Sequence, residues 1–212
     1  MKLGIIGLPS EKNFSMAAEK GLEFLEFCIN VGTDPYEVFN DVNAIKEWSR
    51  KYNIGVASIG TSGTERIDAE GQILEDELKV SYKLIDVAAE LGCPNYVCGC
   101  NYVKELSFYE NCTAAIAFLT KLIEYARPKG VKIATYNCRW NNFIIDSKAW
   151  SIIHEHLKEL GIKYDPTHSR YDGGDYLKEA RDWGNRMTSV RRPSGAPLTT
   201  SATATPAEMM LS

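Results

Sequence analysis

Short apolar segments alternate with longer amphipathic segments along most of this chain of 212 residues. The apolar segments predict strands at about residues 3–7, 24–29, 54–59, 96–100, 131–136 and 162–165. The segments between them predict helices at about residues 15–21, 36–52, 74–91, 108–126, 147–160 and 174–183. Regular alternation of strand and helix predicts an α/β fold built on a parallel sheet.

The number of strand–helix units favours one kind of parallel sheet over another. Six such units match a parallel (β/α) barrel of the TIM type that is incomplete, with about six of its eight units. A doubly wound open sheet also fits the length, but no G-x-G-x-x-G sequence follows a strand, so its dinucleotide-binding form has no support. We therefore predict a barrel domain over residues 1–185.

The composition changes abruptly after that domain. Residues 186–212 are rich in Ser, Thr, Ala and Pro, contain no aromatic residue and show no alternation typical of a strand. Such a segment buries too little apolar surface to offset the entropy of ordering it. We expect an irregular, disordered tail.

Charge and cysteine content restrict the class of protein. The formal net charge of −4, without a basic stripe, argues against nucleic acid as a partner. No apolar run approaches the ~20 residues needed to span a bilayer, so no membrane partner is expected. The six cysteines show no paired C-x-x-C arrangement and are typical of a reduced, cytoplasmic protein.

The most informative candidate site is at the end of the sixth predicted strand. Asp165 and His168 emerge at its carboxyl end, where parallel β/α proteins bind ligands and metals. A carboxylate and an imidazole there can ligate a divalent cation. The alternative is that Asp165 caps the turn that begins at Pro166, with His168 in solvent.

Other polar residues follow strands at the same predicted edge. Arg139, Trp140, Asn141 and Asn142 follow the fifth strand and resemble a sugar-binding loop. Asn137 could offer an amide oxygen to a metal or a sugar hydroxyl, and Arg170 could bind an anionic group. The alternative for Trp140 is packing over the barrel rim. Glu26 is the candidate carboxylate of the second strand, with a salt bridge as its alternative role. His154, on a predicted helix, is expected at the surface.

Three segments together resemble a known family. They are K-L-G-I-I-G at the first strand, G-L-E-F-L-E-F at the second, and D-P-T-H at the sixth. Over about residues 2–185 the chain resembles the xylose isomerase-like TIM barrels, a superfamily of sugar and sugar-phosphate isomerases and epimerases that also includes endonucleases acting on abasic DNA. The resemblance implies a small sugar or sugar phosphate as substrate and a divalent cation, Mn, Mg, Co or Zn, as cofactor.

The family's functional residues carry over only in part. Asp165 matches the metal-binding Asp of strand 6 and, with Glu26 at strand 2, is assigned a catalytic role; His168 matches the His that follows. The metal-binding Glu of strand 5 falls on Tyr136, and strands 7 and 8 have no match. The resemblance therefore implies metal-dependent proton transfer next to a sugar carbonyl. The alternative is a catalytically impaired, truncated barrel that binds sugar or forms a homo-oligomer.

Overall fold

The structure is a computed structural model that describes residues 3–190. Seven strands form one sheet in which every neighbouring pair is parallel and the spatial order follows the chain. The strands are β1 (Gly4–Gly7), β2 (Phe24–Asn30), β3 (Gly55–Ser62), β4 (Asn95–Cys98), β5 (Lys132–Tyr136), β6 (Gly161–Tyr164) and β7 (Met187–Val190). The helices are α1 (Glu11–Glu19), α2 (Pro35–Val38), α3 (Val42–Tyr52), α4 (Glu75–Glu90), α5 (Phe108–Ala126), α6 (Ser147–His156), α7 (Pro166–Tyr171) and α8 (Tyr176–Trp183), with short 3₁₀ turns at Arg127–Lys129 and Gly184–Arg186.

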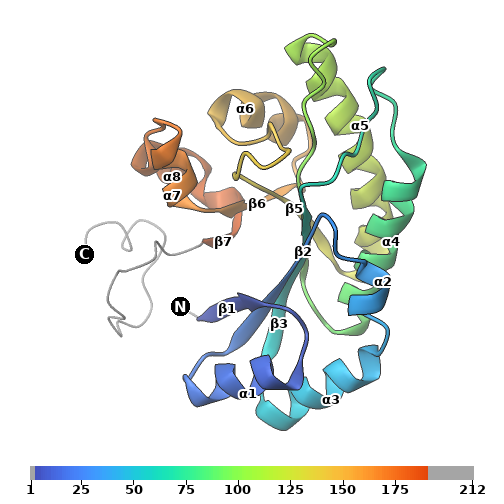
Figure 1. Cartoon of the computed structure of the whole chain (residues 1–212). Helices are drawn as coiled ribbons and strands as arrows, with labels where there is room; N and C mark the ends of the chain where they lie inside the picture. The colour runs from blue at the N-terminus through green and yellow to red at the C-terminus, as the bar shows by residue number, and fades with distance from the viewer. Residues whose placement is uncertain (1–2, 191–212) are drawn as a thin grey trace.

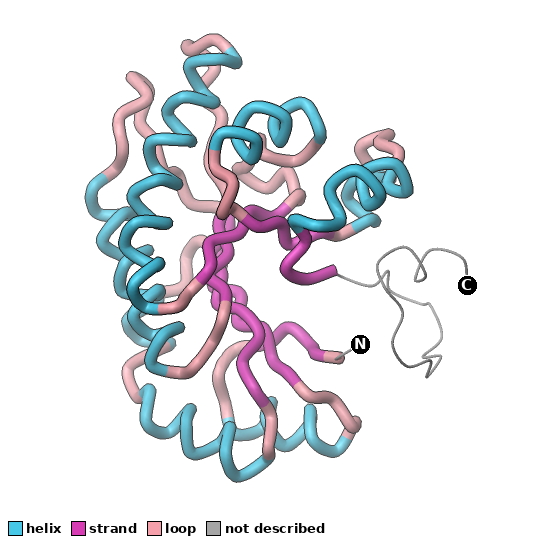
Figure 2. Tube along the Cα trace, turned by 180° about the vertical axis from the view of Figure 1, so that it is seen from behind, coloured by secondary structure: helices cyan, strands magenta, loops and turns pink. Residues whose placement is uncertain are grey.

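The sheet is curled, and the helices cover only its convex face (Figures 1 and 2). Strands β1 and β7 lie at the two ends of the arc and, within residues 3–190, each pairs on one side only. Parallel strands joined by helical crossovers coil in this direction because of their right-handed twist. The predicted incomplete α/β barrel is confirmed as a curled half-barrel.

The seventh strand corrects the prediction that residues after 185 form no strand. Met187 pairs with Ile162 and Ser189 pairs with Lys163, and the Thr188 hydroxyl donates to the Ile162 carbonyl over 3.3 Å. The composition of this segment did not predict the strand, because its four residues contain no long apolar run. They form a strand because β6 provides hydrogen-bond partners along its edge. The rest of the predicted tail lies outside the described residues.

Two helical segments also differ from the expectation. The predicted helix over residues 36–52 is divided into α2 and α3, because the carboxylate of Asp41 accepts a hydrogen bond from the Ala44 N–H at 2.9 Å and begins a new helix. Helix α7 was not predicted. It starts at Pro166 in the first turn, a position where proline's missing N–H has no cost.

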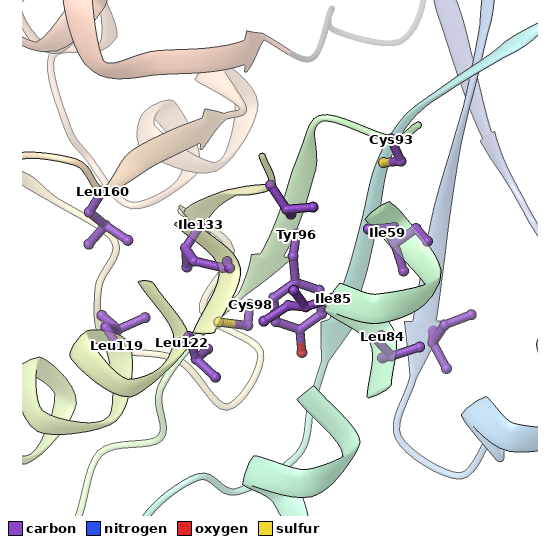
Figure 3. Packing of buried hydrophobic residues seen from close by; sticks show 14 of the residues in the cluster. Ile59, Leu84, Ile85, Cys93, Tyr96, Cys98, Leu119, Leu122, Ile133 and Leu160 are labelled. Carbon is purple, nitrogen blue, oxygen red and sulfur yellow. The ribbon is translucent and has the colours of Figure 1, made fainter. Parts of the chain in front are cut away.

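The hydrophobic core lies between the sheet and its helices. Residues that point to the convex face, such as Leu25 and Ile162, are fully buried. Tyr96, Ile85 and Cys98 belong to the same buried cluster, part of which Figure 3 shows. Side chains alternate along a strand, so the intervening residues line the concave face. That face is polar and partly exposed along β2. Its residues include Glu26, Cys28 and Asn30.

His154 is buried in this structure rather than at the surface as predicted. Its Nε2 lies 3.0 Å from the Thr135 hydroxyl, and its Nδ1 lies 3.3 Å from the Leu160 carbonyl. The ring therefore joins α6 to β5 and to the segment before β6. Burial lowers the pKa of His154 from 6.5 to about 4. Helical spacing did not reveal this, because a histidine whose two nitrogens have partners inside the protein can occupy a core position.

The cysteines form no disulfide bonds with one another in the structure. All six are free thiols, and four of them are buried. In the part of the chain that the structure describes, no helix is both long and apolar enough to cross a membrane.

The buried neutral His154 predicts a pH-dependent stability. Folding favours the neutral ring, so its contribution is fully present above pH 6.5 and is lost as the pH falls toward about 4. Wild-type protein should be about 2 kcal/mol less stable to urea at pH 5 than at pH 7. A His154→Gln variant should show a clearly smaller difference. Equal differences in the two proteins would contradict the assignment.

Candidate active site at the carboxyl end of the half-barrel

Asp165 continues the extended backbone of β6 and forms the N-cap of α7. One carboxylate oxygen accepts from the backbone N–H of Thr167 at 2.9 Å and also from the Thr167 hydroxyl. The other carboxylate oxygen lies 3.7 Å from His168 Nε2. The capping role that the sequence left as an alternative is therefore present. It fixes the carboxylate toward His168, so the cap and a role in binding are compatible.

Asn137 joins the ends of β5 and β6. Its side-chain oxygen accepts from the Asp165 backbone N–H at 2.8 Å, and its amide nitrogen donates to the Asp165 carbonyl at 2.9 Å. Asn137 is 1% exposed. Both polar atoms of the amide are therefore engaged in holding the backbone of Asp165. This geometry makes Asn137 a positioning residue for the candidate site.

The loop after β5 contacts two other loops at the same edge. Arg139 forms an ion pair with Asp172, which follows α7. Trp140 lies against Gly63, whose added Cβ would be 2.9 Å from the indole ring, so the glycine permits the contact. Trp140 nevertheless stays 47% exposed. Its ring both packs on the rim, as the alternative role supposed, and presents an aromatic surface to solvent.

His168 and Arg170 lie on α7, one turn beyond the strand. The His168 side chain is 36% exposed, and within residues 3–190 its recorded partner is Asp165. Arg170 is exposed and forms no ion pair with another described residue. The structure thus brings Asn137, Asp165 and His168 into one contact group and places the Arg139 ion pair on an adjacent loop.

Glu26 lies deeper on the concave face than the other candidates. Its Oε2 is 2.8 Å from Lys163 Nζ of β6, and its Oε1 accepts from the Ser58 hydroxyl of β3 at 2.9 Å. The Glu26 and Lys163 side chains are each 16% exposed. The salt bridge proposed as an alternative for Glu26 is confirmed. The sequence analysis did not assign a role to Lys163, although it shares a strand face with Asp165 two residues later.

A buried arginine anchors the long loop between β3 and α4. The Arg66 side chain is 1% exposed and contacts Glu77 and the Thr61 hydroxyl. Asn101, which follows β4, accepts from the backbone N–H groups of Arg66 and Ile67 at 2.6 and 3.2 Å. The Arg66 guanidinium and the Asn101 amide therefore hold this loop in place.

The residues at this edge of the sheet offer few donors to a divalent cation. Within residues 3–190, no group of three or more His, Cys, Asp or Glu side chains is arranged to hold a metal. Asp165 and His168 offer two donors, and the Asn137 amide is engaged with the backbone. Burial raises the pKa of the Tyr136 phenol well above its ordinary value, so it stays neutral at the position of the family's Glu. Since structural zinc takes four ligands and magnesium six, the described residues do not fit a tightly held cation.

Comparison with known proteins identifies the family. The model of the xylose isomerase-like TIM barrel matches residues 14–191. The chain belongs to this family. The resemblance predicted from its strand motifs is thereby confirmed. A comparison with curated proteins finds no match.

Solved structures agree on the fold. D-allulose 3-epimerase from Methylomonas sp., solved with D-allulose, is 21% identical, with 90% of this chain and 71% of that chain covered and a TM-score of 0.75. AP endonuclease family 2 from Brucella melitensis is 16% identical, with coverages of 94% and 85% and a TM-score of 0.74. The 3-keto-D-glucoside 4-epimerase from E. coli is 17% identical, with coverages of 90% and 78% and a TM-score of 0.70. Several of the similar structures are thus sugar epimerases.

The two bonds from Asn137 predict a large loss of stability in Asn137→Ala. The substitution removes the Asn137 acceptor of the buried Asp165 N–H and one donor to the Asp165 C=O, which keeps its hydrogen bond from the His168 N–H at 3.1 Å, and should lower the free energy of unfolding by about 2 kcal/mol. The matched control is Asn43→Ala, at an exposed position of α3, which should change stability by less than about 0.5 kcal/mol. Urea unfolding measures both. Similar values for the two variants would contradict the positioning role.

Proposed function

We propose that this chain binds a small sugar at the carboxyl end of the half-barrel and catalyses proton transfer next to the sugar carbonyl, as an isomerase or epimerase. The observation that carries the proposal is the convergence of the β5 and β6 ends. Asp165, His168 and the Arg139 loop meet there, with Glu26 on the same concave face. Carboxylate, imidazole and guanidinium groups bind sugar hydroxyls, and an exposed indole stacks on sugar C–H groups.

Asn137 positions Asp165 in this proposal, and the other predicted residues contact the sugar. Asp165 and His168 bind hydroxyl groups of the sugar, and Trp140 covers one of its faces. Arg139 and Arg170 bind oxygens at the outer end, including those of a phosphate where the substrate is a sugar phosphate. A carboxylate accepts the proton from the carbon next to the carbonyl, and Glu26 is the candidate. The family resemblance also implies a divalent cation, to which the described residues offer two donors, Asp165 and His168.

The similar structures suggest which sugars to test. One is a complex with D-allulose, and a D-psicose 3-epimerase was solved in the presence of D-fructose. These proteins share the fold with this chain at low identity. Ketohexoses are accordingly the first probes.

Binding of ketohexoses should depend on Asp165. Calorimetric titration with D-allulose and D-fructose should give saturable binding to the full chain, and Asp165→Asn should weaken it about tenfold, since a hydrogen bond to a charged group is lost. The matched control is Asp175→Asn, which changes the N-cap of α8 at an exposed position and should leave affinity unchanged. Absence of sugar binding, or equal weakening by both variants, would contradict the proposal.

A non-catalytic sugar-binding protein that associates through its sheet edges is the second candidate. The observation that favours it is that β1 and β7 each pair on one side only within residues 3–190, and that Ile6 and Leu8 next to the first edge are 38% and 46% exposed. Unpaired strand edges promote association.

This second candidate predicts a homo-oligomer. Light scattering of the purified chain at increasing concentration should show a dimer or a larger assembly. A Leu8→Lys substitution beside β1 should shift the distribution toward monomer, because it places a charge at the exposed edge. A wild-type protein that stays monomeric throughout the concentration range would reject this candidate.

A further inference from the structure

We propose that Lys163 is the group that polarises the sugar carbonyl, with Glu26 as the base, so that this chain interconverts an aldose and a ketose by proton transfer without a metal ion in that step. This inference rests on the proposed function, and it adds a residue and a reaction type to it. The observation that carries it is the position of one amine and one carboxylate in contact on the concave face.

The contact requires the curl of the whole sheet. Glu26 is on β2 and Lys163 is on β6, and strands β3, β4 and β5 lie between them. Glu26 pairs in register with Ser58, and Lys163 pairs with Tyr136 and Ser189. Neighbours of both residues, such as Leu25 and Ile162, are buried against the helices, so the two charged side chains point to the concave face. There Nζ and Oε2 approach to 2.8 Å.

The Lys163 ammonium and the Glu26 carboxylate can each form further hydrogen bonds. An ammonium group has three N–H donors, and the recorded contact of Lys163 uses one of them for Glu26. The Glu26 carboxylate receives Lys163 on Oε2 and the Ser58 hydroxyl on Oε1, which leaves lone pairs free on both oxygens. Each side chain is 16% exposed, so the pair is shielded but reachable. A donor and a base are thereby held side by side.

Lys163 also connects this pair to the sugar-binding end. Asp165 occupies the next position on the same strand face, about 7 Å toward the carboxyl end of the sheet at the usual rise per residue. A hexose held by Asp165 and His168 is long enough to extend one end toward the pair. We infer that the carbonyl end of the open-chain sugar points inward and that the remaining hydroxyls point to the mouth.

The isomerisation needs only Lys163 and Glu26 to move its protons and electrons. Lys163 donates hydrogen bonds to the carbonyl oxygen and to the hydroxyl oxygen on the adjacent carbon. The Glu26 carboxylate removes the proton from that carbon; the C–H electron pair forms the C=C bond, and the carbonyl π pair moves to oxygen. The hydroxyl proton then passes to the former carbonyl oxygen. Glu26 returns its proton to the former carbonyl carbon, where the C=C pair forms the new C–H bond. The electron pair left on the other oxygen forms the new C=O bond, and both side chains end as they began.

One base on one face of the intermediate determines the reaction type. Glu26 delivers the proton to the same face of the enediol from which it was removed, which is what 1,2-isomerisation requires. Inversion at a single carbon needs a second acid on the opposite face. The substrate class is therefore an aldose–ketose pair, rather than two epimers.

Deuterium exchange tests the assignment in the full chain. Protein treated with EDTA and dialysed is incubated with D-fructose in D₂O, and proton NMR follows deuterium at C1 and the appearance of aldose. Wild type should show both. Lys163→Met should slow exchange at least about 100-fold, the usual effect of removing an oxyanion donor. Glu26→Gln should abolish it. Lys132→Met, at an exposed residue of β5, is the matched control and should keep the wild-type rate.

The outcomes separate this inference from the proposed function. Should Lys163→Met fail to fold, the neutral isostere Glu26→Gln carries the test, with its fold checked by circular dichroism and its sugar binding by calorimetry. Sugar binding without exchange would overturn the roles of Lys163 and Glu26 and leave sugar binding intact. Exchange that EDTA stops and Mn²⁺ restores would overturn the role of Lys163, and product epimers without aldose would overturn the single base. Absence of sugar binding would overturn the proposed function itself.

Discussion

The contact between Glu26 and Lys163 is the interaction on which the concave face of this half-barrel depends. It joins β2 to β6 across three intervening strands, which only a strongly curled sheet allows. Two charges that are each 16% exposed lose much of their hydration, and a partner at 2.8 Å offsets that cost. The Ser58 hydroxyl completes the set. The pair therefore forms only when the sheet is curled. It also stabilises the curled sheet, since flattening the sheet would separate the two charges.

Polar side chains hold the backbone at the carboxyl ends of several strands. Asn137 holds the backbone of Asp165, and Asn101 holds the loop that contains Arg66. Each of these amides accepts hydrogen bonds from buried backbone N–H groups. The result is a rigid rim in which the carboxylate of Asp165 has a defined direction. A rim of this kind positions a ligand at little entropic cost, which is what a binding site requires.

The sequence predicted the parts of the molecule that follow from periodicity. The first six strands and the parallel order came from alternating apolar segments, and the position of Asp165 came from the rule that sites lie at the carboxyl ends of strands. Three features did not follow from periodicity. Strand β7 depends on hydrogen bonds from β6. The burial of His154 depends on partners outside its own helix, the Thr135 hydroxyl and the Leu160 carbonyl. The contact of Lys163 with Glu26 depends on the curl of the sheet. Period-two alternation does place Lys163 on the face of Asp165, and that signal could have marked it.

A double-mutant cycle on the charge pair tests the central claim most directly. The free energies of unfolding of wild type, Glu26→Gln, Lys163→Met and the double variant are measured by urea titration under one set of conditions. The account predicts a coupling energy of about 1 kcal/mol or more, because the two groups contact each other across the curled sheet. Single-variant effects that add within about 0.3 kcal/mol would contradict it. They would mean that the two side chains do not interact in solution and that the half-barrel keeps its curl without them.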